Sequence, residues 1–482
     1  MFNFETVIGI EVHVALNTLT KMFSSALNNH DANPNVNLHI NDLGLPGTMP
    51  QPNKAAVKKA LILAKALNME NVDYLLRFDR KNYFYQDLPK GFQITQQYHP
   101  FAQNGYLEVF SDKKKYQFKI QRFHLEEDTA KQFNINNHLF LDYNRAGAPL
   151  IEIVTDPIFH NAEEVKLYLT TLRHILIHND ISDAKMEAGS MRADINLSVR
   201  PVGSDKFGTR VEIKNVNSLN NIERAIKYET NRQIESLLLG KPIIQSTMHY
   251  DDVTNKTIYM RDKSNDIDYR YMREPNIIQI QLDKIWVDSI YSDNKIVYPI
   301  EIASQLQSVG IETQKINLLL DDIALLKAFN YVAEKTKNFK ETSKWLLVEL
   351  LGILNENNYT FEKNVTVDDL DNIVEMIMLL ENQKINGKQA KVILEHTYKT
   401  KKKPSFLIVD LKMEQITDLN KLRSLLEPII LNNEIKIQKD YKNRPERVES
   451  MILGLLMKAT NGQANPSLAS QIMREMLQKY VQ

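Results

Sequence analysis

The sequence has 482 residues and contains no cysteine. This absence excludes disulfide bonds, a thiol nucleophile and a zinc site built from thiolates of this chain. No apolar run reaches the roughly 18 to 20 residues that a membrane-spanning helix needs. The N-terminal residues lack the charged and apolar leader of a secretory signal. We therefore expect a cytoplasmic protein with no membrane segment.

An excess of charge of one sign is also missing, because 60 Lys and Arg residues balance 60 Asp and Glu residues. Proteins that coat nucleic acids without sequence preference are normally basic, since phosphate contacts supply most of their affinity. The balance argues against that function but leaves room for a local basic surface. Hydrophobic residues make up 43% of the chain, a typical globular composition. The chain is too long for one hydrophobic core, so we expect several domains.

The first part of the chain, to about residue 290, mixes strand and helix patterns. Helix starts are indicated at Asn53, at Asn161 with Glu164, and near residue 220. These elements do not follow a regular βαβ rhythm, so we expect an α+β fold with a large, mainly antiparallel sheet. Alternation predicts strands over 7–16, 116–124, 149–155, 191–200 and 208–216.

Helical periodicity dominates the rest of the chain. Thr366 and Asp369 introduce one helix, a second runs from Gly387 to His396, and the turn at 462–466 precedes a last one. The lysine-rich stretch 399–404 is typical of an exposed link. We predict three domains: a sheet domain over 1–290, a helical domain over 291–404 and a small helical tail domain over 405–482.

The strand predicted over 7–16 places an acid and an imidazole on one face. Side chains alternate along a strand, so Gly9, Glu11 and His13 point to the same side. Such a pair can hold a divalent cation, or it can be a hydrogen-bonded polar pair on an exposed face. The choice depends on which other side chains meet it.

Two further segments place carboxylates in or beside strands. Glu152 lies in the middle of the apolar run 150–154, and a buried carboxylate is costly unless it is paired, protonated or bound to metal. The acids that end the segment 122–128 include Glu126 and Glu127. Alternation does not decide which of the two faces inward, because a strand end or a bulge there would change the pattern. An exposed acidic turn is the simpler interpretation of this segment alone.

Two later strands carry alternating charges. Asp194 shares one face of the strand over 191–200 with Arg192 and Asn196, and Glu212 shares a face of the next strand with Lys214. If the two strands are neighbours, they form a charged floor, although a solvated sheet face gives the same pattern. One histidine with several carboxylates, lysines and arginines suits a site for metal and phosphate on a sheet. Magnesium prefers oxygen ligands, and the histidine also fits manganese or zinc.

An ordered set of segments resembles the B subunit of the aspartyl/glutamyl-tRNA(Asn/Gln) amidotransferase. The resemblance runs nearly end to end, and the order of the motifs makes it specific. The segments are 9–13 (GIEVH), 79–85 (DRKNYFY), 124–128 (HLEED), 142–145 (DYNR), 149–154 (PLIEIV), 185–187 (KME), 208–215 (GTRVEIKN), 268–271 (DYRY) and 462–466 (GQANP).

The resemblance implies a fold and a reaction. The sheet domain is expected to be a glutamine synthetase-like cradle, and the tail domain to be YqeY-like and to contact tRNA. ATP would phosphorylate the side-chain carboxylate of Glu-tRNA(Gln) or Asp-tRNA(Asn), and ammonia would then displace the phosphate. An amidase A subunit would supply ammonia through a channel, and a small C subunit would hold the two larger subunits together. The chain alone should be inactive on glutamine.

The resemblance also implies roles for individual residues. His13, Glu127 and Glu152 are expected to hold one metal ion, Mg²⁺ or alternatively Mn²⁺. Glu11 and Glu212 are expected to hold a second metal ion or to steer ammonia. Separately, Lys81 and Arg145 are expected to contact ATP phosphates, and Asp194 to bind metal or position the substrate.

Departures from the family pattern narrow these expectations. Some members bind zinc through two cysteine pairs near the N-terminus, but the matching region 21–44 has none, and His39 with Asp42 makes a poor zinc site. We therefore expect no zinc. The related archaeal-type subunit is another candidate, but it carries an inserted domain between the cradle and the helices. The segment 275–330 of this chain leaves no space for such a domain. A non-catalytic tRNA-binding scaffold remains an alternative that the lysine run supports, although acids at Glu11 and Glu152 would repel phosphate.

Overall fold

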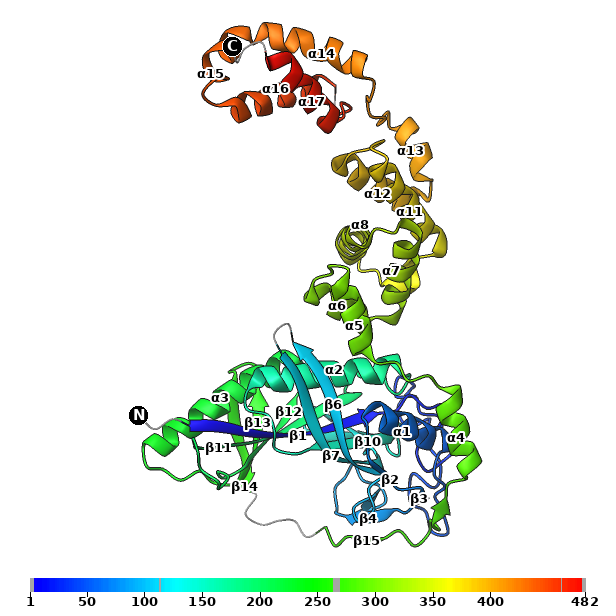
Figure 1. Ribbon diagram of the computed structural model, residues 1–482. Coiled ribbons are helices and arrows are strands. Elements are labelled where there is room, and N and C mark those ends of the chain that lie inside the picture. Colours follow the sequence, from blue (N-terminus) through cyan, green and yellow to red (C-terminus); the bar gives the residue numbers. More distant parts are fainter. Residues whose placement is uncertain (1–3, 112–113, 263–268, 461, 479–482) are drawn as a thin grey trace. The chain divides into compact units, whose positions relative to one another are not determined.

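A nine-stranded sheet dominates the N-terminal part of the computed structural model, which describes residues 4–111, 114–262, 269–460 and 462–478 (Figure 1). Among its described strands only the pair β12–β13 is parallel, so the sheet is mainly antiparallel, as predicted. In spatial order its strands are β14 (Lys256–Asp262), β13 (Ser246–Asp251), β12 (Val211–Val216), β11 (Met191–Pro201), β1 (Phe4–Ala15), β10 (Pro149–Thr155), β7 (Lys114–Glu127), β6 (Ala102–Ser111) and β2 (Asn71–Val72).

Three smaller sheets are also present among the described residues. The first joins segments far apart in sequence, because β15 (Met272–Arg273) pairs with β4 (Asp79–Asn82), which also pairs with β5 (Phe92–Thr95). The others are β16 (Ile280–Gln281) with β3 (Leu75–Leu76), and the hairpin of β8 (Lys131–Ile135) with β9 (His138–Asp142).

One face of the large sheet is covered by helices. On β1 the apolar residues Ile8, Ile10, Val12 and Val14 are almost completely buried, and they belong to one core with residues of α2 (Ala162–His178) and α3 (Leu219–Leu238). Figure 1 shows these two helices along the sheet. Because strand side chains alternate, the polar residues of β1 point to the opposite face.

The predicted helix starts in this domain are confirmed. Helix α1 (Lys54–Ala66) is capped by Asn53, whose side chain accepts a hydrogen bond from the Ala55 N–H. Helix α2 is capped by Asn161, which accepts from the Glu164 N–H, while the Glu164 carboxylate accepts from the His160 N–H. Helix α3 begins at Leu219 after its cap.

We expect the substitution Asn53→Ala to lower the free energy of unfolding by about 2 kcal/mol, at the upper end for a helix cap. The Asn53 side chain also donates to the carbonyl oxygens of Thr20 and Lys21, which are 3.0 Å away, so it fixes the preceding loop as well as the helix. Urea denaturation checks this value. A loss below about 0.5 kcal/mol would show that neither role matters.

The structure divides the chain into two units, 1–304 and 305–482. The boundaries at 290 and 404 that the sequence suggests stay a prediction. Within 422–477 a separate hydrophobic core joins the last helices. The helices after α3 are α4 (Lys284–Asp293), α5 (Pro299–Ser308), α6 (Thr313–Asp321), α7 (Ile323–Thr336), α8 (Phe339–Lys344), the π-helix η1 (Trp345–Leu350), α9 (Leu351–Glu356), α10 (Phe361–Asn364), α11 (Val367–Glu381), α12 (Gly387–Thr400), α13 (Pro404–Asp410), α14 (Leu419–Asn432), α15 (Glu434–Asp440), α16 (Pro445–Ala459) and α17 (Pro466–Leu477).

The lysine-rich stretch confirms its prediction only in part. Helix α12 continues to Thr400 instead of ending at His396, so part of the stretch is helical. The helix ends where Lys401 adopts a left-handed conformation with φ 57°, and the Nζ atom of Lys401 lies 2.7 Å from Asp369 Oδ1. Asp369 also takes part in the predicted capping box with Thr366 at the start of α11. Residues 399–403 are exposed, as predicted, and 401–403 link α12 to α13.

Within the part of the chain that the structure describes, each helix is too short or too polar to cross a lipid bilayer.

Candidate functional site

The open face of the large sheet carries a polar cavity of about 460 Å³. Strand register brings its side chains together, because His13 on β1 lies opposite Glu152 on β10, and Glu152 lies opposite His124 on β7. On the other side of β1, Glu11 lies opposite Asp194 of β11. All five residues line the cavity. Four segments that are distant in sequence therefore meet here without the help of loops, since they form adjacent strands.

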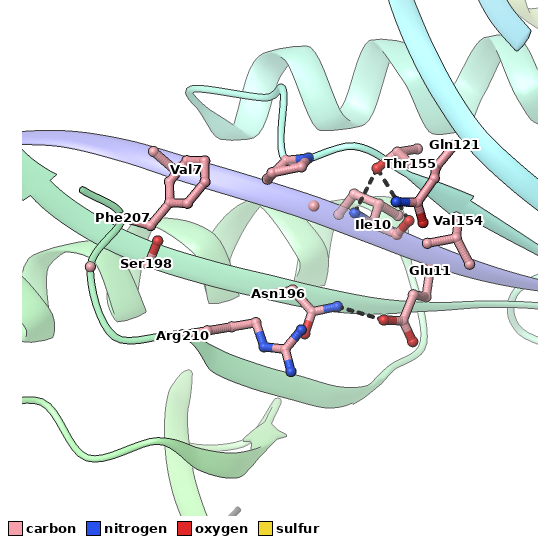
Figure 2. Close-up of a pocket in the computed structure, with 13 residues that line it drawn as sticks. Val7, Ile10, Glu11, Gln121, Val154, Thr155, Asn196, Ser198, Phe207 and Arg210 are labelled. Atoms are coloured by element: carbon pink, nitrogen blue, oxygen red, sulfur yellow. Dashed lines mark hydrogen bonds between the residues drawn. The ribbon is translucent and has the colours of Figure 1, made fainter. Parts of the chain in front are cut away.

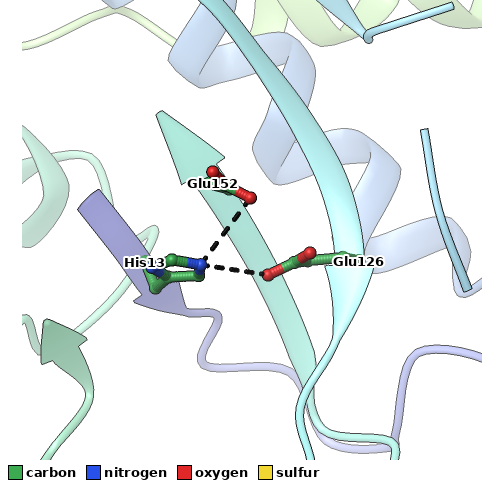
Figure 3. A group of neighbouring side chains, drawn as sticks. All are labelled: His13, Glu126 and Glu152. Carbon is green, nitrogen blue, oxygen red and sulfur yellow. Dashed lines mark ion pairs between the residues drawn. The ribbon is translucent and has the colours of Figure 1, made fainter. Parts of the chain in front are cut away.

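The first group of ligand-type atoms, which we call the His13 cluster, consists of His13, Glu126 and Glu152 (Figure 3). The Nε2 atom of His13 lies 3.5 Å from Glu126 Oε1 and 3.6 Å from Glu152 Oε2. Each residue offers one ligand atom, and these atoms lie within 4.8 Å of one another. One imidazole and two carboxylates at this spacing match the donor set of a divalent cation.

Glu127, which the resemblance assigned to this cluster, lies elsewhere. Strand β7 runs without interruption to Glu127, so Arg122, His124 and Glu126 point into the cavity while Glu127 points to the other side. There Glu127 accepts from the Lys90 ammonium and from the Ile94 N–H at 2.9 Å. The expected placement of Glu127 is therefore wrong, and the neighbouring Glu126 takes that place.

His124 had no role in the sequence-based assignment, yet it joins the two carboxylates. Its Nε2 atom lies 3.2 Å from Glu152 Oε2 and 3.7 Å from Glu126 Oε2. Burial works to lower the pKa of His124, but the carboxylates of Glu152 and Glu126 outweigh burial and raise that pKa to about 9. Burial likewise opposes ionisation of Glu152, but His124, His13 and Lys81 hold its pKa well below the ordinary value. The pair is thus ionised near neutral pH.

The raised pKa of His124 makes stability depend on pH. The folded-state pKa of about 9 exceeds the ordinary 6.5, so the stabilisation is complete below about 6.5 and is lost as the pH rises through about 9. In metal-free protein we expect the difference in unfolding free energy between the wild type and His124→Asn to shrink by up to about 3 kcal/mol over this interval. Urea denaturation at a series of pH values measures it. A difference that stays constant from about pH 6 to 9.5 would contradict the ion pair.

A second group, which we call the Glu11 cluster, consists of Glu11, Asp194 and Glu212, again with ligand atoms within 4.8 Å of one another. Strands β11 and β12 are neighbours, as the charged floor required. The Nζ atom of Lys214 lies 2.7 Å from Asp194 Oδ2 and 3.4 Å from Glu212 Oε1. Burial raises the pKa of Glu11, and the nearby charges of Glu152, Asp194 and Glu212 raise it further. This accumulation of negative charge favours a bound cation.

The two predicted phosphate contacts have different surroundings. Lys81 on β4 lines the cavity, and its Nζ atom lies 4.7 Å from the centre of the Tyr269 ring. Burial works to lower the pKa of Lys81, but Glu126, Tyr271 and Glu152 outweigh burial and raise it.

Arg145 lies apart from the cavity lining. Its guanidinium donates to the carbonyl oxygens of Thr129 and Ala130, each 3.0 Å away, and Asp128 Oδ2 lies 3.5 Å from its Nε atom. Arg145 thus lies outside the lining of the polar cavity, and its expected contact with phosphate stays a prediction.

Several lining residues have no individual role in the sequence-based prediction. Tyr269 and Tyr271 belong to the motif at 268–271, of which Asp268 lies outside the described residues. Thr247 on β13 donates to Glu212 Oε2 at 3.0 Å, and Arg261 on β14 also lines the cavity. The sequence carried a signal only for the residues of β7. Arg122, His124 and Glu126 follow one another at intervals of two, so alternation places them on one face of the strand.

Comparisons with known proteins give the class. A family model described as the GatB/GatE catalytic domain matches residues 6–288, and one described as the GatB domain matches residues 327–477. The fold and its polar cavity therefore belong to a GatB-type catalytic subunit.

Curated relatives of the same length specify the family further. This chain is similar to proteins named as the B subunit of aspartyl/glutamyl-tRNA(Asn/Gln) amidotransferase. The one from Ureaplasma parvum is 46% identical over 99% of this chain and 100% of its own length. Those from Mycoplasma pneumoniae (46% identical, 100% of this chain and 99% of its own) and Malacoplasma penetrans (47%, 98% of each) agree. The chain belongs to the family of these amidotransferase B subunits.

Proposed function

We propose that this chain amidates the side-chain carboxylate of Glu-tRNA(Gln), Asp-tRNA(Asn) or both, at the expense of ATP. The names of its relatives provide the substrate class. The observation that carries the proposal is that two acidic clusters and the cations Lys81, His124 and Lys214 line one cavity on one sheet face. Such an arrangement suits the transfer of a phosphoryl group between two negatively charged reactants.

A carboxylate is a poor electrophile, because its leaving group would be an oxide. The proposed first step transfers the γ-phosphoryl group of ATP to the side-chain carboxylate and releases ADP. Ammonia then attacks the acyl carbon of the mixed anhydride, loses a proton, and expels inorganic phosphate to leave the amide. Walls that exclude water protect the anhydride from hydrolysis.

The donor sets of both clusters fit divalent cations. His13, Glu126 and Glu152 would hold one, and their imidazole nitrogen and carboxylate oxygens fit Mg²⁺ or Mn²⁺. When bound, the cation neutralises charge that develops during phosphoryl transfer. Glu11, Asp194 and Glu212 would hold a second cation or accept hydrogen bonds from incoming ammonia.

The chain's own cations would orient the reactants. The Lys81 ammonium lies over the Tyr269 ring and lines the cavity. The nearby carboxylate of Glu126 favours its charged form by raising its pKa. There it can donate to a phosphoryl oxygen. His124 would keep Glu152 ionised and oriented through the contact of its Nε2 atom with Glu152 Oε2.

We infer that ammonia comes from elsewhere, since the sequence has no cysteine that could act as a glutaminase nucleophile. We propose an amidase A subunit as its source and a small C subunit as a further partner of the complex. The alternative, a non-catalytic tRNA scaffold, is disfavoured because the carboxylates of both clusters would repel tRNA phosphates.

Reconstitution with the A and C subunits tests the proposal. With mischarged tRNA, ATP, Mg²⁺ and glutamine, we expect one ADP to form for each amide, and His13→Ala to abolish both products. The exposed His138 provides a matched control, because His138→Ala removes an imidazole that does not line the polar cavity. Amide formation that needs no ATP, or that survives His13→Ala unchanged, would overturn the proposal.

A further inference from the structure

The side chains of the polar cavity are positioned in two different ways. Those of the large sheet are held by their strand neighbours. Figure 2 shows this for Asn196 on β11, whose Nδ2 atom donates to Glu11 Oε1 on the adjacent strand β1 at 2.9 Å. Lys81 instead lies on β4, which belongs to a separate sheet of three short strands. Pairing within the large sheet therefore does not fix the Lys81 ammonium, so other contacts must do so.

The segment 269–276 brings two aromatic rings to Lys81. Strand β15 within this segment pairs with β4. The rings of Tyr269 and Tyr271 lie 5.8 Å apart, and both residues line the cavity together with Lys81. The Nζ atom of Lys81 is 4.7 Å from the centre of the Tyr269 ring, a distance typical of a cation–π contact. The position of the Lys81 ammonium thus depends on how this segment is held against β4.

We infer that Arg80, Asn82 and Glu274 are positioning residues. Together they clamp the segment 269–276 onto β4 and thereby hold the Lys81 ammonium in place, so we call these three residues the β4 clamp. All three lie outside the lining of the polar cavity, so they act through Lys81 and not on a substrate. The inference rests on the proposed function, in which Lys81 donates to a phosphoryl oxygen.

A buried ion pair forms the first part of the β4 clamp. The Nε and Nη2 atoms of Arg80 donate to Glu274 Oε2 and Oε1 at 2.6 and 3.0 Å, the bidentate geometry of strong arginine–carboxylate pairs. The Glu274 side chain is completely buried, and its Oε1 atom also accepts from the Asn276 N–H at 2.8 Å. The Arg80 guanidinium lies 4.0 Å from the centre of the Phe92 ring on β5. Because strand side chains alternate, Arg80 and Lys81 point to opposite faces of β4, so the ion pair holds the segment from behind.

Asn82 holds the start of the segment in a strained conformation. Its Nδ2 atom donates to the Arg270 carbonyl oxygen at 2.7 Å, and its backbone N–H donates to the Tyr269 carbonyl oxygen at 2.9 Å. Arg270 has a φ of 43°, a left-handed conformation that costs free energy in residues other than glycine. Such strain persists only where the surroundings impose it, and it is common at functional sites. The turn at Arg270 lets the tyrosines on both sides of it line the cavity.

The reactivity of the Lys81 amine tests the β4 clamp independently of the reaction. The full-length chain is treated briefly with acetic anhydride at a fixed pH, and mass spectrometry compares acetylation of Lys81 with that of the exposed Lys206. The Tyr269 ring covers the ammonium in the wild type, so we expect Arg80→Lys and Asn82→Ala to raise the rate at Lys81 about fivefold or more. Asn82 is only partly buried, so Asn82→Ala keeps the test decisive even where Arg80→Lys does not fold.

Arg232→Lys is the matched control for Arg80→Lys. Arg232 donates to both carboxylate oxygens of Glu229 at 2.6 and 2.9 Å, and the Glu229 side chain is completely buried, like that of Glu274. This second pair lies on α3, outside the lining of the polar cavity. We expect both substitutions to lower the midpoint of urea denaturation alike, and only Arg80→Lys to change the acetylation of Lys81.

Steady-state kinetics of the complex with the A and C subunits connects the β4 clamp to the reaction. We expect Arg80→Lys and Asn82→Ala to lower kcat about tenfold or more at saturating ATP, and Arg232→Lys to stay within about twofold of the wild type. The reason is that misplacing a group by about 1 Å costs up to about 10²-fold in rate.

The acetylation rates decide the inference. A wild-type rate at Lys81 in both clamp variants would overturn it. An equal rise in Arg232→Lys would overturn it as well, because the rise would then reflect lost stability alone. Lys81→Met separates the clamp from the proposed function, and we expect it to lower kcat at least as much as the clamp variants do. If Lys81→Met leaves kcat unchanged, the phosphate contact of Lys81 is refuted, while the acetylation rates still decide whether the clamp positions that side chain.

Discussion

Replacing Glu152 by glutamine should lower the rate of ATP-dependent amidation by about 10²- to 10³-fold, the usual cost of losing a preorganised charge in an active site. Glu152 lies 3.6 Å from His13 and 3.2 Å from His124, so its carboxylate joins the proposed cation ligand to the buried imidazole. Glutamine preserves the shape of the side chain but removes its negative charge. The cation would lose a ligand, and the protonated His124 would lose its nearest partner.

The rate is measured as kcat in the complex with the A and C subunits, at saturating ATP and mischarged tRNA. Glu163→Gln is the matched control, because Glu163 is exposed in the first turn of α2 and does not line the polar cavity. A Glu152→Gln enzyme within twofold of the control would exclude Glu152 from the chemistry. Urea denaturation of both variants separates lost chemistry from lost structure.

Glu126 and Glu127 should give opposite phenotypes although they are adjacent. Glu127→Gln leaves the Lys90 ammonium, whose side chain is only 8% exposed, without its countercharge. Breaking a buried ion pair in this way costs about 3–5 kcal/mol of stability. Glu126→Gln instead removes an acceptor from the His13 cluster, so we expect weaker Mn²⁺ binding and lower activity with a smaller loss of stability.

Two measurements on each variant decide this prediction: the free energy of unfolding in urea, and the affinity for Mn²⁺ from electron paramagnetic resonance. We expect Glu127→Gln, where it folds, to bind Mn²⁺ as the wild type does. If Glu127→Gln loses the metal while Glu126→Gln keeps it, the orientation of β7 in this structure is wrong.

Alternation along single strands predicted a substantial part of the site. It placed Glu11 and His13 on one face of β1 and predicted a charged floor from β11 and β12, and the sheet register confirms both. These predictions succeeded because period-two alternation is a local property of an extended chain. It holds wherever one face of the strand packs against a core.

The errors concern properties that are not local. Whether β7 reaches Glu127 depends on its pairing with β10, in which Glu127 lies opposite Pro149. The irregularity in that pair falls between Val154 and Thr155, at the other end of β10. Because the bulge is there, alternation continues through the acids and selects Glu126.

Arg145 and Lys81 show the same limit of prediction from sequence patterns, because other segments of the chain position both side chains. Nothing in the motif at 142–145 indicates that the carbonyl oxygens of Thr129 and Ala130 would accept hydrogen bonds from the Arg145 guanidinium. The contact between Lys81 and Tyr269 depends on the long-range pairing of β4 with β15. Tertiary packing, which a strand pattern does not encode, decides both placements.

The proposed chemistry depends above all on the His13 cluster binding the divalent cation that is used with ATP. Crystals of the complex grown with Mn²⁺ and a non-hydrolysable ATP analogue, with diffraction recorded at the manganese absorption edge, would reveal where the cation lies. We expect an anomalous peak in coordination contact with His13 Nε2 and with carboxylate oxygens of Glu126 and Glu152. Manganese bound to the nucleotide but out of reach of all three side chains would refute this role of the cluster.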